Sequence, residues 1–191
     1  MITHKIITKE TLHKGWSELT KYILEINSVK LGLHQVMREV YDSGDGAAAL
    51  LINSESRKVI LTRQYRLPAH LNGHEDGYLL EASAGLLDTK DPEQAIKKEI
   101  LEETGVVPYR IENIGLSYAS PGAHMEKIHL YLAYYSEKDK IGIGGGLQEE
   151  HEEIEVLEFT FEEIKELYLT GRIQDSKTLI LIQYALINKA I

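Results

Sequence analysis

The sequence predicts a mixed α/β fold, in which a mixed sheet carries helices on both sides. Strand-like segments fill the first forty or so residues and recur through the rest of the chain. Three helix-like segments, each with a start signal, stand among the later strands. Strand and helix do not alternate strictly, so the pattern favours a mixed sheet over a purely parallel one.

The strands are predicted from runs of β-forming residues that end at turn residues. Residues 17–27 and 33–42 follow this pattern near the N-terminus. Residues 46–53 and 58–67, separated by the polar turn 54–57, are typical of a hairpin. The later predicted strands are residues 77–85, 111–118, 127–135 and 154–160.

The first predicted helix has marked ends. Asp91 is a suitable N-cap, Pro92 follows at the first helical position, and Gln94 stands where a capping box needs it. Gly105 suits the C-terminal stop, because glycine adopts the left-handed conformation without strain.

Two further helices are predicted near the C-terminus. Residues 160–163 read Thr-Phe-Glu-Glu, which forms a second capping box, and Gly171 ends that helix. Asp175 is placed to cap a last helix over residues 176–188.

Composition excludes several function classes. The chain has 30 acidic and 21 basic residues, which give a net charge of -9. This charge disfavours nucleic acid as a partner and suits a protein that binds cations, or a substrate that arrives with cations. It has no cysteine, so disulfides, thiolate zinc sites and cysteine nucleophiles are excluded. The N-terminus has no signal-peptide pattern, and no apolar run approaches the roughly 20 residues of a membrane span. We expect a soluble, cytoplasmic protein without a membrane partner.

Three carboxylates share one face of the first helix. Glu99, Glu102 and Glu103 stand at i, i+3 and i+4, where like charges repel each other. Lys98 can pair with Glu102, which would make this only a solvated, salt-bridged face. However, a loop of small residues precedes the helix, and clustered carboxylates suit a hard cation such as Mg²⁺ or Mn²⁺. Together they favour a site for a diphosphate and its metals.

Residues 85–106 resemble the signature of the Nudix hydrolase family, G-x5-E-x7-R-E-U-x-E-E-x-G-U, where U is aliphatic. From Lys98, which takes the arginine position, the match is in register. Gly85 to Glu99 is one residue shorter than the signature, so its first glutamate falls on Lys90 or Asp91. Asp91 is adequately explained as the helix cap.

The resemblance covers essentially the whole chain and favours the branch that cleaves nucleoside diphosphate sugars. It is carried by REVYDSGDGAAALLIN, RQYRLP, EASAGLLD, SPGAHMEK and QDSKT. It implies Mg²⁺-dependent hydrolysis of a diphosphate bond, with GDP-mannose giving GMP and mannose 1-phosphate; Mn²⁺ is an alternative metal. An ADP-ribose or broad-range pyrophosphatase shares this frame. A non-catalytic nucleotide-sugar sensor is the alternative of another class, but the glutamates are intact and about 190 residues leave no room for a second full domain.

By the same resemblance, Glu99, Glu103 and the carbonyl of Ala84 are metal ligands, and Glu102 is a weaker or water-mediated ligand, or a partner for Lys98. The late acidic loop should supply the general base and a further ligand. Counting back from residues 154–156 favours Glu152, as ligand or base, with Glu153 beside it. Counting forward from the glycines favours Glu150, and Glu149 is a further candidate. The predicted catalytic set is Glu103, Glu152 and Glu153.

Substrate contacts also follow from the resemblance. They are predicted at Trp16, Arg38, Glu39, Arg66, Gly85, Leu86, Glu126 and Lys177. A lone tryptophan more often packs in a core or a dimer contact, and a lysine at a helix start is more often solvated.

The resemblance further implies an α/β/α sandwich over residues 43–191. Residues 1–42 would form a small antiparallel β unit that contacts substrate and pairs with a second subunit. A homodimer would also cover strand edges that a monomer leaves open.

Overall fold

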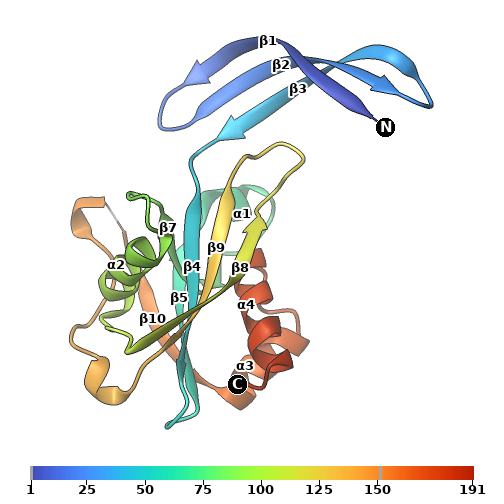
Figure 1. The fold of residues 1–191 in the computed structure, drawn as a ribbon. Coiled ribbons are helices and arrows are strands. Elements are labelled where there is room, and N and C mark those ends of the chain that lie inside the picture. The colour runs from blue at the N-terminus through green and yellow to red at the C-terminus, as the bar shows by residue number, and fades with distance from the viewer. Residues whose placement is uncertain (1, 151) are drawn as a thin grey trace. The chain divides into compact units, whose positions relative to one another are not determined.

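The computed structural model describes residues 2–150 and 152–191. The chain forms two compact units (Figure 1). One unit comprises the residues up to Asp45 together with Tyr118–Lys127. The other comprises Gly46–Ser117 and Ile128–Ile191.

The first unit is an antiparallel sheet of three strands in the order β1–β2–β3. Its strands are β1 (Thr3–Lys14), β2 (Glu18–Ser28) and β3 (Gly32–Asp42). The strands β2 and β3 agree with the predicted strands 17–27 and 33–42 to within one residue at each end. Tyr41 bridges to His124, which joins residues 118–127 to β3.

The second unit is built on a seven-stranded sheet of order β10–β5–β4–β9–β8, with β6 on β5 and β7 on β4. The pairing of β4 with β9 is parallel and that of β4 with β5 is antiparallel, so the sheet is mixed, as predicted. The strands are β4 (Gly46–Asn53), β5 (Lys58–Tyr65), β6 (Tyr78–Glu81), β7 (Ser83–Leu86), β8 (Arg110–Tyr118), β9 (Lys127–Tyr134) and β10 (Glu155–Thr160).

Helices cover both faces of this sheet (Figure 1). The helix α2 (Pro92–Thr104) packs on β4 and β7, and α3 (Phe161–Leu169) and α4 (Ser176–Ile187) pack on the other side. Every residue of β4 is consequently buried, which explains its continuous apolar sequence. Ile96 and Ile100 of α2 join this core. The predicted mixed α/β fold class is confirmed.

The predicted helix starts are largely correct. Asp175 accepts the N–H of Thr178, and Thr160 makes its capping box with Glu163. The side chain of Asp91 also caps α2. The predicted box between Asp91 and Gln94 is wrong, because the N–H of Asp91 donates to Thr89 Oγ1 over 3.3 Å.

The single strand predicted over residues 77–85 is also wrong. The strand is interrupted at Ala82. Before this residue, β6 pairs with β5, and after it, β7 pairs with β4. The Ala82 N–H donates instead to Thr178 Oγ1 over 2.7 Å. A short helix, α1 (Leu67–Leu71), was not predicted; Pro68 in its first turn ends the preceding strand.

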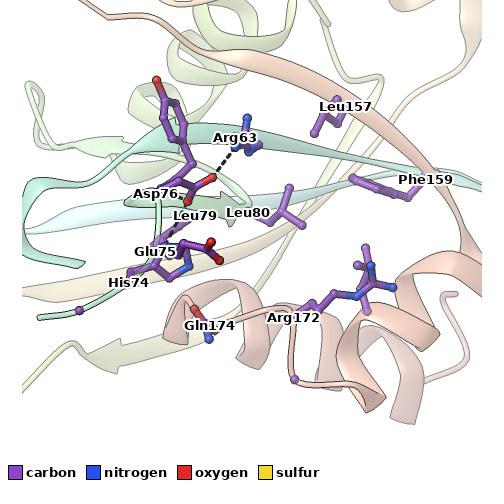
Figure 2. A pocket seen from close by; sticks show the side chains of 14 residues that line it. Arg63, His74, Glu75, Asp76, Leu79, Leu80, Leu157, Phe159, Arg172 and Gln174 are labelled. Atoms are coloured by element: carbon purple, nitrogen blue, oxygen red, sulfur yellow. Dashed lines mark hydrogen bonds and ion pairs between the residues drawn. The ribbon is translucent and has the colours of Figure 1, made fainter. Parts of the chain in front are cut away.

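A hollow in this unit has a volume of about 950 Å³ and lies between β5, β6 and β10 and the segment around α3 (Figure 2). Leu80, Leu157 and Phe159 form part of its wall, and Arg63, which is paired with Asp76, lies at its edge. None of the predicted site residues lines it. Across residues 2–150 and 152–191, no helix is both long and apolar enough to cross a membrane.

Candidate active site

The three stacked carboxylates of α2 lie in three different environments. Glu102 is partly exposed and pairs with Lys98 over 3.6 Å, as predicted. Glu99 is partly buried, and Glu103 is only 4 % exposed because it points toward the sheet. Glu103 is therefore the buried carboxylate of the three, whereas Glu99 and Glu102 each keep partial exposure.

Gly85 leaves room for the Glu99 side chain in its present position. A β-carbon at residue 85 would lie 2.1 Å from the Glu99 carboxyl carbon, which is far inside van der Waals contact. The missing side chain lets β7 approach the helix and leaves room for the carboxylate. Gly85 and the adjoining Leu86 lie in β7, and the Leu86 side chain is partly exposed.

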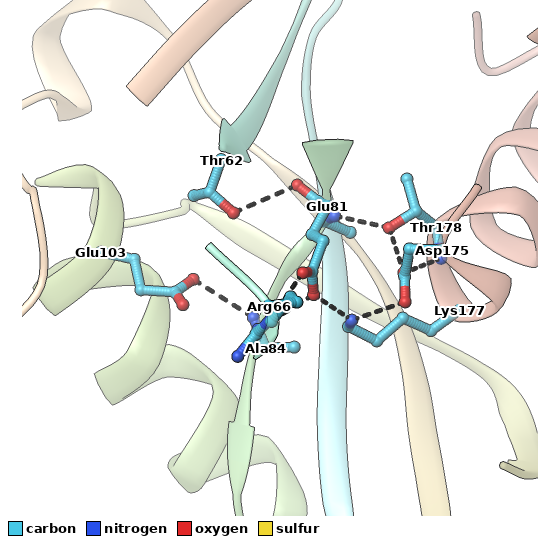
Figure 3. A network of polar contacts seen from close by, with 9 residues as sticks. Thr62, Arg66, Glu81, Ala84, Glu103, Asp175, Lys177 and Thr178 are labelled. Carbon is cyan, nitrogen blue, oxygen red and sulfur yellow. Dashed lines mark hydrogen bonds and ion pairs between the residues drawn. The ribbon is translucent and has the colours of Figure 1, made fainter. Parts of the chain in front are cut away.

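Glu103 is tied to the same strand. Its Oε2 accepts the N–H of Ala84 over 3.2 Å (Figure 3). Burial raises the pKa of Glu103 to about 8, and the charges of Glu99 and Glu152 add to this effect. The Ala84 N–H and the nearby Ser83 hydroxyl oppose the rise, although the hydroxyl geometry falls short of a hydrogen bond.

The glycine-rich loop before the late glutamates is bonded to the end of α2. The N–H of Gly145 donates to the Glu103 carbonyl over 2.8 Å, and that of Gly146 to the Glu102 carbonyl over 3.2 Å. A helix leaves its last carbonyls without partners, and here the loop supplies them. Gly144 has a φ of 66°, which lets the chain turn against the helix.

This contact brings Glu152 to the α2 glutamates. Glu152 Oε2 accepts the N–H of Leu147 over 3.2 Å, and a β-carbon on Gly146 would lie 2.7 Å from this oxygen. Glu152 contributes to the raised pKa of Glu103, as expected for neighbouring carboxylates.

Two of the other late glutamates do not belong to this cluster. The side chains of Glu149 and Glu153 are exposed to solvent. The side chain of Glu150 lies outside what the structure describes, as does His151. Among the late glutamates whose side chains are described, Glu152 therefore has the position expected of a ligand, and the catalytic role of Glu153 stays a prediction.

The predicted substrate residues Arg66 and Lys177 meet at a carboxylate that was not predicted. Arg66 donates from Nε and Nη2 to the two oxygens of Glu81, over 2.6 and 3.0 Å (Figure 3). Lys177 pairs with Glu81 and, over 2.9 Å, with Asp175. Lys177 is only 13 % exposed, so the solvated alternative for this lysine is wrong.

The sequence did carry a signal for Glu81. It is the one charged residue in the otherwise apolar and small-residue run from Gly77 to Gly85. A carboxylate in a buried strand needs cationic partners, and those partners come from distant segments that a local pattern does not connect.

The remaining predicted residues belong to the first unit. Trp16 is 78 % exposed, so it does not pack in a core. Arg38 donates from Nη1 to the Met37 carbonyl, and both Arg38 and Glu39 are exposed. Glu126 is half-buried and lies 3.5 Å from His124 Nδ1.

The clustered glutamates fit a hard divalent cation. Glu99, Glu103 and Glu152 offer only carboxylate oxygens, which Mg²⁺ and Mn²⁺ prefer. In the described residues, no three Asp, Glu or His side chains are already arranged to coordinate one metal ion. The side chains of Glu99, Glu103 and Glu152 would therefore have to rotate to bind an ion. A cation would also offset the repulsion from Glu99 and Glu152, which adds to the effect of burial on the pKa of Glu103.

Comparison with known proteins shows the family of this chain. Residues 42–180 match the model of the NUDIX domain. The GDP-mannose pyrophosphatase of Pectobacterium atrosepticum is 44% identical over 183 residues, which cover 96% of this chain and 94% of that protein. Those of Yersinia enterocolitica and Escherichia coli K12 are 41% and 40% identical, and each alignment covers at least 93% of both proteins. The chain therefore belongs to the Nudix family.

Proposed function

We propose that this protein hydrolyses the diphosphate bond of GDP-mannose to give GMP and mannose 1-phosphate, with Mg²⁺ as cofactor. The observation that carries the proposal is the carboxylate cluster of the buried Glu103 and the partly buried Glu99 and Glu152, in a chain 44% identical to a GDP-mannose pyrophosphatase over nearly its whole length. The cytoplasmic location stays a prediction.

The chemistry requires negative charge to be offset. A diphosphate is already anionic, and attack by water concentrates more charge on its oxygens. Glu99, Glu103, Glu152 and the Ala84 carbonyl would hold Mg²⁺, which, when bound, neutralises the phosphate oxygens and lowers the pKa of water.

The protein's own residues do the rest. Glu152 or Glu153 would accept the proton of the attacking water, whose oxygen forms a bond to one phosphorus while the bridging oxygen leaves with the other phosphate. Arg66 and Lys177 would contact the phosphate oxygens, because cationic donors stabilise them throughout the reaction. Trp16, Arg38, Glu39, Gly85, Leu86 and Glu126 would contact the rest of the substrate.

The test is phosphate release from a panel of nucleotide sugars with Mg²⁺, coupled to a phosphatase that acts only on the products. The panel contains GDP-mannose, GDP-glucose, ADP-ribose and UDP-glucose. We expect the highest kcat/KM on GDP-mannose and no turnover after chelation of the metal. A preference for ADP-ribose would change the assigned substrate but leave the proposed hydrolysis of a diphosphate bond unchanged. Binding without turnover would indicate a sensor.

We also propose that the protein is a homodimer formed through its N-terminal unit. In that unit β1 is exposed along its whole length, and large apolar side chains such as Ile6, Leu33 and Met37 are more than half exposed. A second copy would cover these side chains and the strand edge.

A further inference from the structure

Glu81 is a buried carboxylate that the proposed chemistry does not use. Its side chain is 4 % exposed, and it forms ion pairs with two cations, the guanidinium of Arg66 and the ammonium of Lys177. Burial raises the pKa of Glu81, but these two cations more than offset the effect, so its pKa lies below the usual range. Glu81 is therefore a fully charged counterion for both.

The whole network is anchored at the break in the sheet. Glu81 is the last residue of β6, and the following N–H, of Ala82, donates to Thr178 on α4. The same helix start holds Asp175, which accepts from Thr178 and pairs with Lys177. Two acidic and two basic side chains thus form a fixed, neutral group.

This group adjoins the glutamate cluster. Three residues after Glu81, the Ala84 N–H donates to Glu103, so one short segment contacts both sites (Figure 3). Arg66 is close enough for the Glu103 charge to raise its pKa. Asp175 acts on Arg66 in the same way but already pairs with Lys177, so without Glu81 the carboxylates that are proposed to bind metal would compete for Arg66.

We propose that Glu81 is a positioning residue that holds Arg66 and Lys177 beside the metal glutamates and keeps Arg66 from pairing with them. This inference rests on the proposed function, in which Arg66 and Lys177 meet the diphosphate and the glutamates bind Mg²⁺. The bidentate contact fixes the plane of the guanidinium, and its Nη1 side keeps donors for a second acceptor. Arg66 is 41 % exposed, as such a contact requires.

The experiment measures binding of Mn²⁺ to the substrate-free protein by electron paramagnetic resonance of the free ion, alongside GDP-mannose turnover. Glu81→Gln should raise the Mn²⁺ Kd about fivefold or more, because an uncompensated cation then faces the glutamates. Adding Arg66→Gln should bring the Kd back most of the way, since the competing guanidinium is gone. A merely structural role would not be rescued by a second substitution.

Glu158→Gln is the matched control. Glu158 also carries two cations, Lys58 and Lys140, but it lies on β10 and contacts none of the site residues in the described contacts. Its Mn²⁺ Kd should equal that of the wild type. If Glu81→Gln does not fold, Glu81→Asp replaces it, because the shorter carboxylate keeps the charge but cannot reach both partners; its weaker Mn²⁺ binding should again be rescued by Arg66→Gln.

Two results would overturn the inference: an unchanged Mn²⁺ Kd in the Glu81 variant, or a double variant that binds no better than the single one. Failure of the proposed function gives a different pattern. If the wild type binds Mn²⁺ but releases no phosphate from any nucleotide sugar, the hydrolase assignment is wrong. The comparison of Mn²⁺ Kd values still tests whether Glu81 keeps Arg66 from the glutamates. A wild type that binds no Mn²⁺ refutes both.

Discussion

At the scale of single residues, the local pattern gives the face of a helix but not the depth of each side chain. The spacing of Glu99, Glu102 and Glu103 predicts that they are neighbours, and the pairing of Glu102 with Lys98 follows from the sequence alone. That Glu103 is buried follows from the approach of β7, which brings the Ala84 N–H to its carboxylate. Tertiary contacts of this kind are absent from the spacing.

The burial of Glu103 makes a prediction. Glu103→Gln should lower kcat at least about 100-fold, because a neutral amide cannot replace a charged metal ligand. The metal-free protein should be no less stable, since burying an amide costs less free energy than burying a carboxylate. Steady-state kinetics and thermal unfolding measure the two effects.

Glu93→Gln is the control for this variant, because Glu93 lies in the first turn of the same helix and pairs only with Lys97 in the described contacts. Its kcat should stay near the wild-type value. Near-normal turnover by Glu103→Gln would show that the metal assignment is wrong.

At the scale of elements, the helix caps were predictable and the strand break was not. Asp91, Thr160 and Asp175 cap their helices because capping depends on residues close in sequence. The break at Ala82 depends on a change of partner strand and on a hydrogen bond to Thr178, 96 positions away. The same break aims Glu81 and Ala84 at two different clusters.

The contact between the glycine loop and α2 makes a second prediction. In Gly144→Ala the new β-carbon would lie 2.3 Å from the Glu103 carbonyl oxygen, and the backbone has a φ that alanine disfavours. Gly171→Ala, where φ is 71° and nothing lies within 4 Å, isolates the backbone strain alone. That strain costs about 1 kcal/mol of unfolding free energy.

Gly144→Ala should lose at least about 1 kcal/mol more than this control, because the loop must also move away from the helix. Its Mg²⁺ requirement should rise as well, since Glu152 moves with the loop. Equal losses in the two variants, by chemical denaturation, would show that the loop does not pack as described.

The Glu81 network makes a prediction about pH. The pKa of Glu81 is lowered in the folded protein, so its ionised form adds stability above the ordinary carboxyl value of 4.5. That contribution is lost as the pH falls through the folded-state pKa. The difference in melting temperature between wild type and Glu81→Gln should therefore be largest near about pH 7 and shrink below pH 4.5. A difference that stays constant with pH would contradict the pairing.

At the scale of the whole molecule, the fold class was predictable because most strands and the three longer helices carry a local sequence pattern. The mixed sheet, the buried β4 and the helices on both faces all follow from apolar runs and caps. The oligomeric state does not follow from these patterns, because it depends on whether a second copy binds the exposed apolar side chains of the first unit.

The proposed dimer makes the last of these predictions. Leu33 and Met37 point to the same side of β3 and are 67 % and 53 % exposed. Replacing both with lysine should convert a dimer into monomers in sedimentation velocity, because charges at a buried interface oppose association. Ile187→Lys, at an exposed position on α4, should leave the sedimentation coefficient unchanged. A wild type that sediments as a monomer would refute the proposal.

The bonds from Gly145 and Gly146 to the end of α2 also determine how this loop exchanges with solvent. Glycine-rich loops usually give up their amide hydrogens to deuterium quickly, yet these two amides are held by helix carbonyls. They can exchange only when the loop lifts from the helix, and that motion also carries Glu152 away from Glu103. The exchange rate of these two glycine amides thus reports the opening of the proposed catalytic centre. Mg²⁺ bound between Glu103 and Glu152 should slow their exchange.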